Sequence, residues 1–469
     1  MEPKPRRLFP WALLLAFLVS LPAVTTRIYA SDEIQYFAYL RSLWFDRDVS
    51  FENEYRHFYD AGIARSPGFH ETFLERTTAT GRRINFATIG CGLLWAPFYA
   101  IADVGVQLAN ARGARIARDG YSRPYIAAVA YASAFYGLLA LMLSVQAVRL
   151  VSTHWPKLGP RAVPSAVLVW IGTPLLFYMY IAPPMSHATS AFAVALFVVT
   201  WLRVRETWSL GGLIALGAAT ALMTMVREQD AFFAVGAAID FLHAQVTRRD
   251  DGTARRFANA VAGIAAATLA FTPQALAYLA LNGEVGPSRL VARKMTWSAP
   301  HAVEVVASPA HGFFVWTPLA VLAIAGLFIL LRRLGAGHRQ IAVCVLVMAA
   351  IQIYVAGSVE SWTVAGAFGQ RRFVALTPIL TLGVAALLTA AATRRFVSLL
   401  ATVALLAACW WNIGLMAQFG AGMMNRQKLE PSRIAYNTFV VMPRALPGLA
   451  WRYVLDRASF YESARRLRG

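Results

Sequence analysis

The acidic residues of this 469-residue chain are concentrated in one segment near its start. Nine of the 24 aspartates and glutamates lie between residues 27 and 83, and the run begins with Asp32 and Glu33. A carboxylate can accept the proton of an attacking hydroxyl group and stabilise positive charge that develops at a reacting carbon. We therefore predict catalytic roles for Asp32 and Glu33, and a substrate-binding role for Asp48 in the same segment.

Helix capping would explain part of this pattern. Ser31 followed by two acids, ahead of an amphipathic stretch, is typical of a helix N-terminus, where the helix dipole favours carboxylates. Asp48 falls at the far end of that stretch, where the dipole disfavours acids, and loops as long as residues 27–83 are usually functional. These arguments favour a functional role for Asp32, whereas capping or solvation is an equal alternative for Glu33 and Asp48.

A second polar cluster, Arg227 to Asp230, lies between two apolar runs that leave little room for a solvated loop. Ionisable groups at membrane depth usually pair with one another or line a cavity. We predict that Arg227, Gln229 and Asp230 bind substrate, with a simple ion pair between Arg227 and Asp230 as the structural alternative.

Arg371 and Arg372 form a third cluster, after Gly366 and Gly369. The planar guanidinium group binds phosphate through two parallel hydrogen bonds. These two arginines are therefore expected to hold a phosphate or pyrophosphate group, and contact with ordinary anionic head groups is the equal alternative.

Two histidines occupy the ends of apolar runs. His187 follows a pair of prolines, and His311 precedes a glycine at the start of another run. Both are substrate-binding candidates, although a lone histidine in such a place is more often a structural hydrogen-bonding residue. No HxxH or HxxE pattern accompanies His187, so we predict neither a metal site nor a cofactor, and dependence on a divalent metal stays open.

The composition places these clusters in a helical membrane protein. Hydrophobic residues make up 58% of the chain, charged residues only 14%, and the mean hydropathy is +0.51. The net charge of +20 does not indicate nucleic-acid binding, because the arginines are scattered in short groups between apolar runs. The three cysteines lie in apolar segments and lack a CxxC pattern.

Apolar runs of spanning length recur along the chain. The first is residues 9–26, and the later ones are residues 124–147, 162–181, 186–202, 210–226, 231–246, 258–281, 312–331, 341–357, 373–392 and 397–415. Short basic loops alternate with the segments 183–187, 227–230, 282–311 and 357–372, and Lys4, Arg6 and Arg7 precede the first run. The positive-inside rule then predicts about 11 transmembrane helices, a cytoplasmic N-terminus and an external C-terminus.

Residues 84–110 are also apolar enough to cross, but one more crossing would move every later basic loop outside. We therefore interpret them as a re-entrant, membrane-parallel or broken-helix element, for which Pro97 is suitable, with a conventional crossing as the alternative. The resulting organisation is an all-α polytopic domain at residues 1–416, a first external loop with membrane-associated helices at 27–123, and an external interfacial tail at 417–469.

The order of these motifs resembles that of bacterial integral-membrane glycosyltransferases of the GT-C superfamily, which include the protein O-mannosyltransferases and the aminoarabinose transferase of lipid A. The matching segments are residues 31–36, 41–48, 85–90, 94–98, 172–176, 185–188 and 368–373. A second acidic motif of the best-known relatives is missing, so Glu71, Glu75, or Asp46 and Asp48, would have to replace it.

The resemblance implies a sugar donor linked to polyprenyl phosphate and transfer to a lipid, glycan or protein acceptor of the cell envelope. Asp32 would activate the acceptor, Arg371 and Arg372 would hold the donor phosphate, and inversion is usual with such donors. The expected location is the bacterial inner membrane, with the active site facing the periplasm. The alternatives are a transporter or flippase for lipid-linked sugars, in which paired inverted repeats would be expected, or a non-catalytic subunit for envelope assembly.

Overall fold

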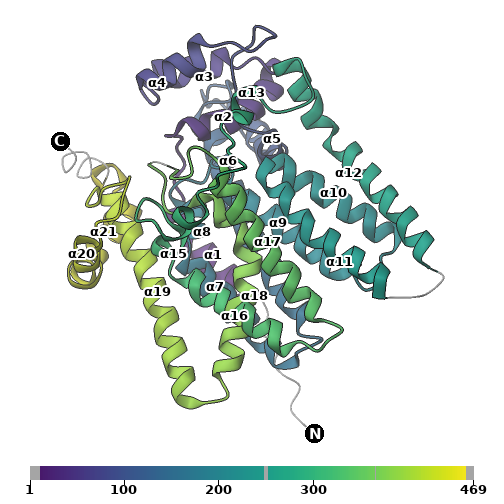
Figure 1. Ribbon diagram of the computed structural model, residues 1–469. Helices are drawn as coiled ribbons and strands as arrows, with labels where there is room; N and C mark the ends of the chain where they lie inside the picture. The colour runs from purple at the N-terminus through teal and green to yellow at the C-terminus, as the bar shows by residue number, and fades with distance from the viewer. Residues whose placement is uncertain (1–10, 248–251, 365, 461–469) are drawn as a thin grey trace.

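The protein is all-helical in the part that we describe, a computed structural model of residues 11–247, 252–364 and 366–460 (Figure 1). Lys4, Arg6 and Arg7, which support the predicted orientation of the N-terminus, lie outside these residues. The α-helices are α1 (Trp11–Ser20), α2 (Ser31–Arg41), α3 (Glu52–Asp60), α4 (Pro67–Phe69), α5 (Gly90–Ala111), α6 (Arg123–Val151), α7 (Ala162–Gly172), α8 (Leu175–Tyr180), α9 (His187–Val204), α10 (Leu210–Val226), α11 (Ala234–Thr247), α12 (Thr253–Asn282), α13 (Arg289–Ala292), α14 (Ala302–Ala307), α15 (Phe313–Trp316), α16 (Leu319–Arg333), α17 (Arg339–Ser358), α18 (Thr377–Ala391), α19 (Arg395–Ala421), α20 (Pro431–Tyr436) and α21 (Met442–Leu455). Short 3₁₀ or π-helical turns are η1 (Leu21–Ala23), η2 (Ser42–Asp46), η3 (His70–Glu75), η4 (Pro156–Arg161), η5 (Glu228–Phe233), η6 (Arg371–Leu376) and η7 (Asn437–Val441).

Seven helices in the described residues are long and apolar enough to cross a membrane. Six of them, namely α6, α9, α12, α17, α18 with η6, and α19, coincide with predicted spans. These helices confirm the predicted class, a polytopic helical membrane protein. The sequence could predict this class because a spanning helix needs an apolar run of about 20 residues.

The predicted total of about 11 spans is not confirmed, because the other predicted spans contain shorter helices. Residues 162–181 form α7 and α8 with a break at Thr173 and Pro174, and residues 312–331 form α15 and α16 with a break at Thr317 and Pro318. Proline lacks the amide hydrogen that would continue the helix and disfavours helical geometry in the residue before it.

Residues 90–111 form one continuous helix, α5, with Pro97 inside it, so the broken-helix form of the prediction was wrong, whereas the re-entrant and membrane-parallel forms stay predictions. Its length and composition would allow it to cross a membrane. It packs on α6 as far as the middle of that helix, where Tyr136 donates to the carbonyl oxygen of Leu94 at 2.9 Å. The Ile89 amide donates to Gln274 near the end of α12, Cys91 meets Thr189 in the first turn of α9, and Asp103 accepts from Tyr125 near the start of α6.

Close packing between helices depends on glycine. A Cβ atom on Gly217 of α10 would lie 2.0 Å from the carbonyl oxygen of Gly263 on α12, and one on Gly326 of α16 would lie 1.8 Å from that of Gly383 on α18. Small residues allow helix backbones to approach where no hydrophobic effect drives association between helices in lipid. These pairs fix the bundle on which the polar end is built.

The segments between α1 and α6 gather at one end of the bundle, where α2, α3 and α4 lie above the long helices in Figure 1. The C-terminal segment also packs there. α19 continues to Ala421, past the predicted boundary at residue 416. After α21, Arg457 donates hydrogen bonds of 2.8 Å to the carbonyl oxygens of Val24 and Pro22, which ties this segment to the linker between α1 and α2.

Candidate functional site

The two acids at the start of α2 have different surroundings. Glu33 is buried, and its Oε2 accepts hydrogen bonds from the amides of Tyr29 and Ala30, at 2.6 and 3.0 Å. Burial raises the pKa of Glu33 to about 7 despite these two bonds. These contacts favour the capping alternative for Glu33 over the catalytic role that we predicted.

Asp32 instead points to a distant segment. Its Oδ2 lies 2.7 Å from Nη1 of Arg371, at the start of η6. Their side chains are 38% and 23% exposed, so the ion pair is accessible to a ligand. The backbone turns tightly before η6, because Gly366 and Gly369 have φ values of 76° and 62°, and glycine adopts this left-handed region without strain. Asp32 and Arg371 are far apart in the sequence, and only the fold brings them into contact.

A second cluster adjoins the first. Nη1 of Arg227 donates to Nδ1 of His187 at 3.1 Å, and Nη2 donates to Oε1 of Gln229 at 3.1 Å. Because arginine is only a donor, Nδ1 of His187 must be unprotonated. Gln229 in turn donates to the carbonyl oxygen of Arg372 at 3.2 Å, which links this cluster to the residue after Arg371. Arg227, Arg371 and Arg372 all lie close enough for their charges to act on His187.

Asp230 does not form the ion pair with Arg227 that was the structural alternative. Its Oδ2 accepts from Ser190 of α9 at 2.6 Å, and its Oδ1 is buried without a hydrogen-bond partner among the described residues. Burial raises the pKa of Asp230 to about 6, while the nearby Arg227 charge acts in the opposite direction. Asp230 therefore acts on the cluster indirectly, because its partner Ser190 lies on α9, the helix that begins with His187.

Arg372 is partly occupied by the protein itself. Its Nη1 donates to the carbonyl oxygen of Ser361 at 2.9 Å, and its Nη2 lies 3.3 Å from the Ser361 hydroxyl. This side chain therefore fastens the loop after α17 beside η6. Of the two arginines predicted to hold phosphate, Arg371 pairs with a carboxylate that a phosphate can replace, whereas Arg372 is bonded to the loop at Ser361.

The fold does not bring two of the predicted residues into this cluster through direct contacts. Asp48 accepts from Ser42 at 2.7 Å and from the Ser50 amide at 2.9 Å in a local turn, beyond the opposite end of α2 from Asp32. His311 is fully buried, stacks on Trp316 at 4.6 Å, and donates from Nε2 to the carbonyl oxygen of Ala367 at 2.9 Å. His311 therefore holds the loop that precedes Arg371. Its own backbone is left-handed, with a φ of 67°.

Two tyrosines that sequence reasoning missed also belong to the site. Tyr36 lies one turn after Asp32 on α2, bonds to Ser186, and is close to the charges of Asp32 and Arg227. Tyr178 packs its ring against His187 at 4.4 Å and donates to the carbonyl oxygen of Phe368 at 3.0 Å. The spacing of four residues between Asp32 and Tyr36 was a signal available in the sequence, because it places both on one face of a helix.

Two cavities flank this site. One of about 350 Å³ is bordered by Ala30, Glu33, Tyr178 and Phe368, with the guanidinium groups of Arg27 and Arg426 in its wall. An apolar cavity of about 390 Å³ shares Ile181 and Gly420 with it and runs between α1, α7, α19 and α21. In the described residues no group of three or more His, Cys, Asp or Glu side chains could hold a metal ion.

No protein-family model matches this chain, and no curated protein matches it.

Proposed function

We propose that this protein is a membrane glycosyltransferase of the GT-C type, which moves a sugar from a polyprenyl-phosphate donor to an acceptor on the external face of the bacterial inner membrane. One observation carries the proposal: the Asp32 carboxylate and the Arg371 guanidinium, from distant segments, meet at 2.7 Å at one accessible point. A base and a phosphate-binding cation are the two groups that such a transfer needs.

The proposed reaction begins when donor phosphate binds to Arg371. The guanidinium group has further donors, so it can take phosphate oxygens and release Asp32 from the ion pair. Asp32 then accepts the proton of the acceptor hydroxyl as its oxygen attacks the anomeric carbon. The bond from that carbon to the phosphate oxygen breaks, polyprenyl phosphate leaves on Arg371, and the configuration at the carbon inverts.

The cavities beside the site suit a lipid-linked donor. The apolar cavity between α1, α7, α19 and α21 can take part of a hydrocarbon chain, and it meets the cavity that contains Arg27 and Arg426. A polyprenyl chain that runs from the first cavity through the second would end at Tyr178, close to Arg371, which would hold the donor phosphate. Apolar pockets with a few convergent polar groups are typical ligand sites.

The test compares envelope glycans and lipids by mass spectrometry in cells that lack this protein and cells that carry variants of it. The native chain should restore the mass of one sugar residue on an envelope molecule. Asp32→Asn keeps the volume of the side chain but removes the base, so transfer should fall by about 10²- to 10⁴-fold. Asp60→Asn, an exposed aspartate at the end of α3, is the matched control and should transfer normally.

The same experiment separates the alternatives. A transporter or an assembly subunit does not need a base, so normal sugar transfer in cells with Asp32→Asn would exclude the catalytic assignment. Thermal unfolding of the purified variant in detergent shows whether a loss of transfer comes from misfolding, since the Asp32 variant should unfold within a few degrees of the native protein.

A further inference from the structure

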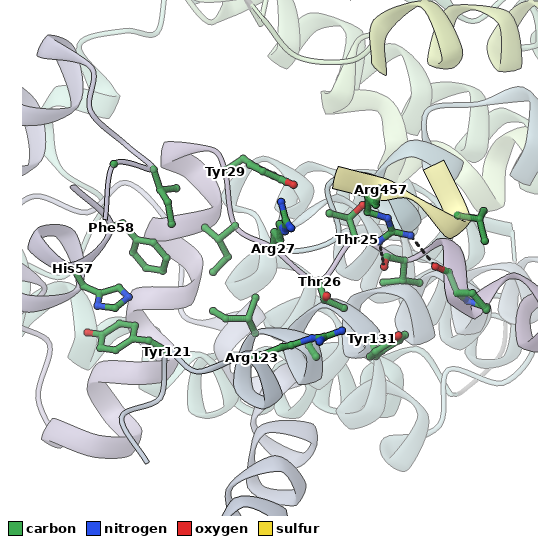
Figure 2. Close-up of a pocket in the computed structure, with 18 residues that line it drawn as sticks. Thr25, Thr26, Arg27, Tyr29, His57, Phe58, Tyr121, Arg123, Tyr131 and Arg457 are labelled. Carbon is green, nitrogen blue, oxygen red and sulfur yellow. Dashed lines mark hydrogen bonds between the residues drawn. The ribbon is translucent and has the colours of Figure 1, made fainter. Parts of the chain in front are cut away.

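A larger cavity lies apart from the ion pair. Its volume is about 930 Å³, near the upper end of ordinary ligand pockets, and it opens between the linker from α1 to α2, the helix α3, the start of α6 and the C-terminal segment (Figure 2). Neither Asp32 nor Arg371 borders it. The proposed transfer reaction therefore does not yet account for the cavity.

The charged groups that line this cavity are cationic. They are Arg27, Arg123, Arg457 and, when protonated, His57, and no carboxylate is among the lining residues. Arg457 is committed to backbone carbonyl groups, shown by the dashed lines in Figure 2. Arg27 and Arg123 are exposed and make no hydrogen bond or ion pair with any described residue. Two such guanidinium groups in one concave wall favour an anion, and a phosphate fits their geometry.

Aromatic rings form one end of the cavity. The His57 ring stacks on Tyr121 with centroids 3.8 Å apart, and Phe58 lies beside them in Figure 2. Tyr131 lies at the other end, near Arg123. Aromatic faces offer flat apolar surfaces to which the C–H faces of a sugar or cyclitol ring can pack. The Tyr121 ring is covered by His57 and Arg41. Tyr131, by contrast, is 39% exposed, so a ring bound against Tyr131 would have its phosphate near Arg123.

The rim of the cavity suits a lipid anchor. Val454 of α21 lines the cavity and is 41% exposed, and its neighbours Trp451 and Leu455 are 68% and 61% exposed. Exposed apolar side chains on one short amphipathic helix are typical of an element that lies in a membrane interface. A ligand with its head group in the cavity could leave its hydrocarbon chains beside this helix.

We propose that this cavity binds the phosphate-bearing sugar or cyclitol head group of a lipid, which serves as the acceptor. The acceptor role rests on the glycosyltransferase function proposed above, whereas the binding does not. Arg27 and Tyr29 border both this cavity and the cavity beside Tyr178, so a single linker separates the two. That linker runs directly into α2, which carries Asp32 in its first turn.

Binding is measured without turnover, on the full-length Asp32→Asn protein in nanodiscs. The lipid probe is phosphatidylinositol in phosphatidylcholine, because it joins a ring to a lipid through a phosphate, and the soluble probe is glucose 1-phosphate. Phosphatidylinositol should raise the unfolding temperature in a saturable way. Arg123→Gln should raise the half-saturating mole fraction by about tenfold or more, as expected for the loss of a charge-assisted hydrogen bond. Arg27→Gln should act in the same direction.

Arg115→Gln is the matched control, because Arg115 is an exposed arginine between α5 and α6 that does not line the cavity. It should bind phosphatidylinositol like the parent protein. Equal stabilisation by phosphatidylglycerol would overturn recognition of the ring, and equal stabilisation by glucose 1-phosphate would overturn the lipid source. No stabilisation by either probe, or an equal loss in Arg115→Gln, would overturn the site. The sugar-transfer assay in cells with Asp32→Asn is a separate measurement. Its result tests the proposed glycosyltransferase function and not the binding of lipid to this cavity.

Discussion

At the scale of single residues, the ion pair between Asp32 and Arg371 suggests how a base is kept beside a phosphate site before substrate arrives. Each partner neutralises the other, and both remain partly exposed. A phosphate that competes for Arg371 would free the carboxylate only when donor is present. Arginine suits this exchange better than lysine, because its planar fork can bind two oxygens at fixed geometry.

Replacing Arg371 by lysine tests this exchange. The variant keeps the positive charge but loses the two-pronged contact with phosphate, so we expect KM for the donor to rise by about tenfold, with a smaller fall in kcat. Steady-state kinetics of purified protein with the lipid-linked donor measure both constants. A fall in kcat with unchanged KM would contradict a role in holding donor phosphate.

Glu33 gives a prediction about pH. Its pKa rises from 4.5 to about 7 on folding, so the folded state holds this proton more tightly than the unfolded chain does. The stabilisation is complete below pH 4.5 and is lost as the pH rises to about 7, with an amplitude of about 3 kcal/mol. Glu33→Gln keeps an acceptor for the two amides but cannot ionise.

The unfolding temperature of Glu33→Gln relative to native protein should therefore increase between pH 5 and pH 8, measured by thermal unfolding in detergent. Sugar transfer should persist in this variant, since the contacts of Glu33 are with the backbone. A difference that does not change with pH would contradict the buried ionisable state, and loss of transfer from a stable protein would restore the catalytic role.

The sequence predicted the members of the site better than their connections. Asp32 stood out because it begins a long, acid-rich loop directly after the first apolar run, although helix capping was a structural alternative. Its partner could not be read, since the contact with Arg371 depends on how η6 and α2 pack. Proximity along the chain suggested that Arg227 pairs with Asp230. In the structure Arg227 instead donates a hydrogen bond to His187, and Asp230 accepts one from Ser190.

At the scale of elements, apolar run length identified most of the long helices, because hydrophobic thickness fixes the length of a span. The breaks were less predictable. Thr317 and Pro318 interrupt one predicted span, whereas Pro97 is accommodated within α5. The same residue type has opposite outcomes because neighbouring contacts decide whether the freed carbonyl group and the bend can be tolerated.

The placement of α5 can be tested by chemical labelling. All three native cysteines are buried, so a single Arg112→Cys substitution after α5 supplies an accessible thiol. If α5 does not cross the membrane, as the stacking of His57 before it on Tyr121 after it favours, a membrane-impermeant maleimide should label this thiol in intact cells. Arg65→Cys in the first loop is the external control, and Arg203→Cys at the end of α9 should stay unlabelled in intact cells only if α5 does not cross. Labelling only after the cells are lysed would mean that α5 crosses.

At the scale of the whole molecule, the direction of α5 decides the orientation of everything after it. With α5 on the surface, the loops that contain Arg149, Arg203, Arg332 and Arg394 all lie on the cytoplasmic side, as the positive-inside rule requires. With α5 across the membrane each of these loops would be external, but the stacking of His57 before α5 on Tyr121 after it puts both flanks of α5 on one face. The orientation of the C-terminal segment is a separate measure, which shows the face that carries Asp32, because Arg457 bonds to the linker before α2.

Fusions of alkaline phosphatase provide that measure, because the enzyme is active only where its disulfides can form. A fusion after Lys428, beyond α19, should be active, and a fusion after Thr393, between α18 and α19, should be inactive. This outcome would place the cavity bordered by Arg457 on the external side together with Asp32. Transfer requires this arrangement, because the lipid acceptor and the polyprenyl donor must meet on one side of the membrane. The reverse pattern would move both sites to the cytoplasmic face and exclude external transfer.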